Sequence, residues 1–87
     1  MGKKLKTYLT QGEMYRIKEL DLELMHYLMS MMLDCTYIMR AVSQRNDTKI
    51  IDKVEMLNTR LTKINDIVTK MNEIITTNEE EEKVDGE

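Results

Sequence analysis

Proline, tryptophan and phenylalanine are absent from this sequence, which also has only three glycines, one histidine and one cysteine. Without proline the chain lacks the commonest helix breaker, and its leucine, methionine, glutamate and lysine residues are good helix formers. A single cysteine excludes an internal disulfide and suits a reducing compartment. The sequence therefore predicts an all-α protein, for which we expect a cytoplasmic location.

Catalytic signatures are missing as well. The 87 residues contain no glycine-rich phosphate loop, no paired metal-ligand motif and no triad order typical of hydrolases. A chain of this length forms one small domain at most. Its hydrophobic share of 41% favours a folded chain over a disordered one. We expect a protein that is not an enzyme and that binds no cofactor and no metal.

The most apolar run, residues 24–42, has the length of a membrane span. It contains His26, Asp34 and Arg40, and charges in the middle of a span are costly in a bilayer. The first residues are followed by polar side chains, so no secretory signal is visible. We interpret the run as a buried helix of a soluble protein and expect no membrane partner.

The strongest pattern lies in residues 50–77, which form four heptads with an apolar residue at two fixed positions. We letter the heptad positions so that Ile50 is d and Val54 is a. Apolar a and d positions over four heptads predict a helix that packs along a coiled-coil-like seam. The predicted seam residues of this second helix are Ile50, Val54, Leu57, Leu61, Ile64, Val68, Met71 and Ile75.

A first helix is predicted over residues 11–44. Thr10 and Glu13 fit a capping box, in which each residue accepts a hydrogen bond from the backbone of the other. Asp21 is the one polar residue among the a and d positions of this helix. Its predicted seam residues are Leu24, Leu28, Met31, Cys35, Ile38 and Val42.

The heptad phase slips between the two helices, within a polar run at residues 43–48. Asn46, Asp47 and Thr48 in this run are all suitable N-caps. The slip predicts a turn at residues 45–48 and a second helix over residues 48–77, which together with the first makes an antiparallel hairpin at residues 10–77. One continuous helix over residues 11–77 is the alternative, and the phase slip and the polar run count against it.

The two ends of the chain differ in charge. Residues 1–9 carry three lysines and no acidic residue, whereas residues 79–87 carry six acidic residues and one lysine. Consecutive glutamates oppose the dipole at a helix C-terminus. We expect a basic arm at residues 1–9 and an acidic disordered tail at residues 78–87, both solvated.

The first helix carries more apolar residues than one seam can cover. Such a surface usually marks an interface, and a lone hairpin buries little apolar area. We therefore expect a homodimer that forms a four-helix bundle, and a small interaction module (an inhibitor, adaptor or assembly factor) with an unidentified protein target. The residues expected to form the partner or oligomer interface are Leu22, Met25, Met29, Met32 and Met39.

Two other functions are compatible with the pattern. A nucleic-acid-binding helical bundle of the ROP type needs a basic face, but Lys53 and Arg60 are interleaved with acidic residues and suggest a solvated surface. A soft-metal sensor that binds Cu(I) through methionine sulfur is the other alternative, although packing explains a methionine stripe more simply. His26 fits a polar face, and Cys35 fits a small buried hydrophobe.

Three asparagines stand beside the second seam. Asn58, Asn65 and Asn72 all occupy position e, seven residues apart. Asparagine next to an apolar seam can fix alignment through hydrogen bonds between helices. Ordinary solvated side chains are the alternative interpretation.

Overall fold

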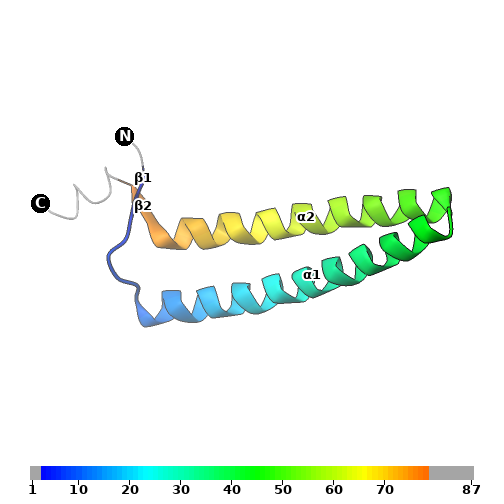
Figure 1. The fold of residues 1–87 in the computed structure, drawn as a ribbon. Helices are drawn as coiled ribbons and strands as arrows, with labels where there is room; N and C mark the ends of the chain where they lie inside the picture. The colour runs from blue at the N-terminus through cyan, green and yellow to red at the C-terminus, as the bar shows by residue number, and fades with distance from the viewer. Residues whose placement is uncertain (1–2, 79–87) are drawn as a thin grey trace, which may run out of the picture.

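The computed structural model describes residues 3–78, which form a hairpin of two long antiparallel helices (Figure 1). Helix α1 spans Gln11–Ser43 and helix α2 spans Asp47–Ile75. Strands β1 (Lys3–Leu5) and β2 (Thr76–Asn78) pair at the end opposite the turn. The predicted helical hairpin is confirmed by the packing of α1 against α2, and a single continuous helix is excluded.

Helix α1 begins at the capping box that the sequence predicts. The hydroxyl oxygen of Thr10 accepts a hydrogen bond from the backbone N–H of Glu13 at 3.1 Å, and Oε1 of Glu13 accepts one from the backbone N–H of Thr10 at 2.9 Å. The first amides of a helix have no partner within the helix. These two bonds therefore fix the start of α1.

Three residues connect the helices. Arg45 adopts a positive φ of 55°, and its N–H donates to the carbonyl of Val42, while the N–H of Asn46 donates to the carbonyl of Ala41. This pair of bonds is a Schellman motif, which closes a helix C-terminus. Asn46 is the N-cap of α2, because its side chain accepts from the N–H of Lys49 at 3.2 Å. The turn begins one residue before the predicted 45–48, and α2 also begins one residue early.

The seam of the hairpin runs along positions d and g of both helices. The residues at these two positions recur at spacings of three and four, which is the spacing of one helical face, and all of them are buried or half-buried. On α1 these are Ile17, Leu20, Leu24, Tyr27, Met31, Asp34, Ile38 and Ala41. On α2 they are Ile50, Lys53, Leu57, Arg60, Ile64, Ile67, Met71 and Ile74.

The prediction that the a residues line this seam is wrong. The exposed a residues are Leu28, Cys35, Val42, Val54, Leu61 and Val68, whereas Ile75 is half-buried. When the contact lies between d and g, position a is roughly a quarter turn away from it. The expectation of a buried Cys35 is wrong for the same reason.

An ion pair occupies the centre of the seam. Oδ2 of Asp34 lies 2.5 Å from Nε of Arg60, and Asp34 is only 2% exposed. Arg60 was expected on a solvated surface, and this expectation is wrong. Its guanidinium supplies the partner that a buried carboxylate requires.

The β ribbon ties the two ends of the described chain together. Lys4 pairs with Thr77 and Leu5 with Thr76, and the N–H of Lys6 donates to the carbonyl of Ile75 at 2.8 Å. The basic arm is therefore not a free end at residues 3–5. Residue 78 belongs to β2, and the rest of the predicted acidic tail lies outside the described residues.

Within residues 3–78, neither helix combines the length and the apolar character that a membrane crossing requires.

Candidate interaction face

The hairpin has two broad faces, one on each side of the seam. Because both helices are right-handed and they run in opposite directions, equivalent heptad positions beside the seam fall on the same face. Arg16 and Glu23 at position c of α1 and Lys70 at position c of α2 line one shallow depression of about 240 Å³. The c residues of both helices therefore share one face, and the a residues share the other.

The face that carries the a residues is apolar. Beside each a residue on the helical wheel lies the e residue of the same heptad. We call the following exposed a and e residues the apolar face: Met25, Leu28, Met32, Cys35, Met39 and Val42 on α1, and Ile51, Val54, Leu61 and Val68 on α2. No a or e position from Met25 to Val42, or from Ile51 to Ile75, holds a charged residue.

The ends of the apolar face are marked by charge and by the turn. Lys18 at position e and Asp21 at position a bound it near the start of α1. Toward the turn it continues to Val42 and resumes on α2 at Ile51, which is 61% exposed. The face thus covers the half of α1 nearer the turn and extends along α2 from Ile51.

The predicted interface residues divide into two groups. Met25, Met32 and Met39 lie on the apolar face, where the last two are 71% and 72% exposed. Leu22 and Met29 occupy position b, which is opposite the seam, and they lie on the outer edge of α1. The half of the face on α2 was not predicted, because its a residues were assigned to the hairpin seam.

The opposite face is polar and mixed in charge. The depression formed by Arg16, Glu23 and Lys70 also includes Glu19. Nearer the turn, Nζ of Lys53 lies 4.7 Å from the ring centre of Tyr37, a cation–π contact. The aliphatic part of Lys53 can therefore lie at the seam while its charge points to this face.

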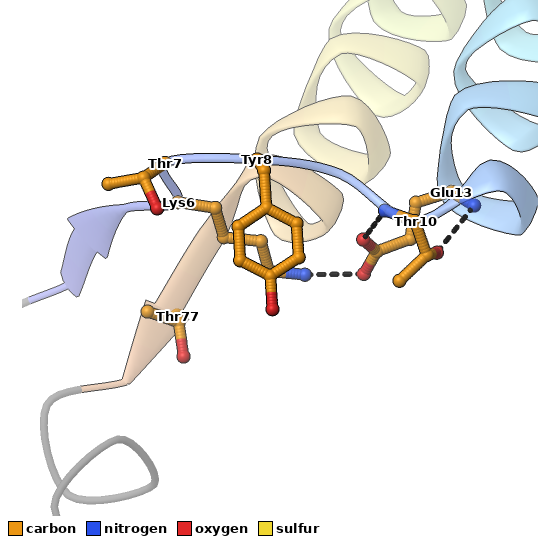
Figure 2. A pocket seen from close by; sticks show the side chains of 6 residues that line it. All are labelled: Lys6, Thr7, Tyr8, Thr10, Glu13 and Thr77. Atoms are coloured by element: carbon orange, nitrogen blue, oxygen red, sulfur yellow. Dashed lines mark hydrogen bonds and ion pairs between the residues drawn. The ribbon is translucent and has the colours of Figure 1, made fainter. Parts of the chain in front are cut away.

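A second hollow, of about 250 Å³, lies where the β ribbon meets the start of α1 (Figure 2). Its only charged lining residues are Lys6 and Glu13, and Nζ of Lys6 lies 2.5 Å from Oε2 of Glu13. The hydrogen bond from Lys6, together with that from the N–H of Thr10, lowers the pKa of Glu13. The two charges therefore form an ion pair with each other, so we assign this hollow a structural role.

The residues considered for metal or acid–base chemistry lie apart. The ring of His26 is in edge-on contact with Tyr27, at 6.0 Å between centroids, and Cys35 is exposed on the apolar face. Among residues 3–78, no three His, Cys, Asp or Glu side chains are grouped so that they could hold a metal ion. The apolar face is therefore the feature that we consider for binding.

The fold and this face define a class: an antiparallel α-helical hairpin with one apolar and one polar side. Comparison of the chain with protein-family models, curated protein sequences and solved structures finds no match. The geometry of the hairpin is therefore the basis on which we assign a function.

Proposed function

We propose that this protein is a non-enzymatic interaction module whose apolar face binds a second copy of the chain, which gives a four-helix bundle. The observation that carries the proposal is an uncharged apolar surface contributed by both helices. Exposed apolar patches of such length are uncommon on monomers and mark interfaces. The bundle would serve as an inhibitor, adaptor or assembly factor for another protein.

The small core of the single hairpin supports self-association. Among the described residues, only Leu20, Ala41 and Ile67 are buried apolar side chains. The d residues, such as Leu24 and Leu57, remain half-exposed because they lie on the side of the seam next to the apolar face. A second hairpin placed on this face would bury d, a and e residues together, which is how each helix of a four-helix bundle contributes to its core.

The shape of the face also favours a second copy as the partner. It spans residues 25–42 of α1 and begins at Ile51 on α2, and its a and e positions carry no charge that a partner must neutralise. An identical hairpin offers a surface of the same length and the same apolar character, so that a two-fold axis brings like surfaces together. The polar face carries charges of both signs at Arg16, Glu19, Glu23 and Lys70, so it lends no comparable support to nucleic-acid binding.

The outer edge of α1 is the proposed contact for a protein target. Leu22 and Met29 are 58% and 64% exposed and point away from α2. They would stay accessible when the apolar face is covered. Methionine is flexible and polarizable, which suits adaptable binding surfaces.

Sedimentation equilibrium tests the proposal. The protein concentrations should bracket the micromolar range, in which typical dimers dissociate. Leu28→Glu and Leu61→Glu each place a charge on the apolar face, one on each helix. Leu33→Glu is the matched control, because Leu33 is 58% exposed but lies at position f, away from this face. We expect dimers for the wild type and the control, and helical monomers for the other two variants. A monomeric wild type, or dimers that persist in both face variants, would refute self-association through this face.

A further inference from the structure

The two long edges of the apolar face differ in chemistry. The e residues of α1 are Met25, Met32 and Met39, and we call them the methionine edge. The e residues of α2 that follow Ile51 form the asparagine edge, which consists of Asn58, Asn65 and Asn72. All six side chains are exposed. The face is therefore bordered by thioethers on one side and by amides on the other.

The side-chain amides of the asparagine edge have no partner within residues 3–78. The neighbouring threonines bond only to backbone carbonyls: Thr62 donates to the carbonyl of Asn58 at 3.1 Å, and Thr69 donates to that of Asn65 at 2.8 Å. These bonds leave the amide groups of the asparagines available. Each amide can donate two hydrogen bonds and accept two.

Two identical hairpins can stack face to face in two ways, because the two-fold axis must lie in the plane between them. An axis parallel to the helices brings both turns to the same end and places α1 on α2 of the second copy. The methionine edge then meets the asparagine edge. An axis perpendicular to the helices places the turns at opposite ends, α1 on α1 and α2 on α2, so that each edge meets its own kind.

We infer, on the basis of the proposed function, that the second copy packs with its turn at the opposite end and that the asparagine edge selects this arrangement. Thioether sulfur is a weak acceptor and no donor, so an amide that lost its water against methionine would be left without partners. Against the same edge of the second copy, amide donors meet amide acceptors. The methionine edges meanwhile bury apolar surface against apolar surface.

The distance between the two turns distinguishes the arrangements. Gln44→Cys in a Cys35→Ser background places one spin label on each turn, at an exposed position. Turns at opposite ends should give a distance of ~50 Å, the length of a 33-residue helix. Turns at the same end should give ~20 Å, since packed helices lie about 10 Å apart. Pulsed dipolar spectroscopy of the labelled dimer resolves the two values.

A long distance in the labelled dimer supports the inference, and a short one overturns it while leaving the dimer intact. Absence of any dipolar coupling together with a monomer mass refutes the proposed function instead. Replacing Asn58, Asn65 and Asn72 by Leu removes the difference between the edges, and we expect a short-distance population to appear. The control, Thr62→Leu with Thr69→Leu, should keep the single long distance. If the asparagine variant also keeps it, the asparagines do not select the arrangement.

Discussion

Asp34 on α1 and Arg60 on α2 join the helices through two hydrogen bonds, with 2.5 Å between Nε and Oδ2 and 3.4 Å between Nη2 and Oδ1. The carboxylate is almost fully buried, and its hydrogen bond raises the pKa of Arg60. A shift of the helices by one heptad would place Asp34 opposite Lys53 or Ile67, other g residues of α2. A shift that places Asp34 opposite Ile67 would leave its carboxylate without a partner. The ion pair of Asp34 and Arg60 therefore opposes this misalignment of the helices.

The first prediction follows from this pair. Arg60→Leu leaves the Asp34 carboxylate unpaired at the seam, and we expect the free energy of unfolding to fall by about 3 kcal/mol. Asp34→Leu combined with Arg60→Leu should recover most of the loss, because two apolar residues replace the buried pair. Urea unfolding at one fixed protein concentration measures both variants. An Arg60→Leu protein as stable as the wild type would show that the pair contributes nothing.

Local signals made the helices and their ends predictable from the sequence. The hydrogen bonds of the capping box and of the N-cap Asn46 join residues three positions apart. A short stretch of sequence therefore shows both partners of each bond. The β ribbon could not be predicted in this way. Its strands have three residues each and pair residue 4 with residue 77, and neither segment carries a strand pattern of its own.

The sequence did not predict that the seam lies at positions d and g, because this choice depends on contacts between residues far apart in the chain. The a row is apolar throughout α2, whereas the g row includes Lys53 and Arg60. Because apolar residues are expected inside, the sequence pattern favours a over g as the seam position. The g row is buried because Asp34 neutralises Arg60 and because the stem of Lys53 can pack while its ammonium lies over Tyr37. The same misassignment hid the half of the apolar face that lies on α2.

The second prediction concerns acid stability. The pKa of Glu13 lies below its ordinary value of 4.5, chiefly because Lys6 donates to its carboxylate. The folded state thus binds the proton more weakly than the unfolded state. The stabilisation is present above pH 4.5 and is lost as the pH falls through the lowered pKa. Glu13→Gln cannot titrate, so its thermal midpoint should fall less than that of the wild type between neutral and acid pH. Parallel acid profiles of the two proteins would contradict this.

The third prediction concerns the turn. Arg45 has a φ of 55°, in the left-handed region that glycine adopts without steric cost. We expect Arg45→Gly to raise the free energy of unfolding by about 1 kcal/mol, because relief of the left-handed strain exceeds the entropy that glycine loses. Gln44→Gly is the control, since Gln44 has a right-handed φ of −89° and should lose stability. Chemical denaturation of both variants measures the difference, and a destabilised Arg45→Gly protein would contradict the expectation.

The last prediction uses Cys35 as a native reporter of the apolar face. Its thiol is exposed in the single hairpin and lies among residues that a second copy would cover. A thiol reagent should therefore react more slowly as the protein concentration rises, by about tenfold when nine-tenths of the chains are dimeric. Thr36→Cys in a Cys35→Ser background moves the thiol by one residue to position b, on the outer edge of α1.

This control should react at the same rate at every concentration, because the outer edge would remain open in the proposed bundle. Leu28→Glu with the native Cys35 should also react at a constant, fast rate, since the charge prevents the second copy from binding. The comparison separates coverage of the apolar face from any general effect of concentration on the reagent. A Cys35 rate that does not change while sedimentation shows a dimer would mean that the chains associate through another surface.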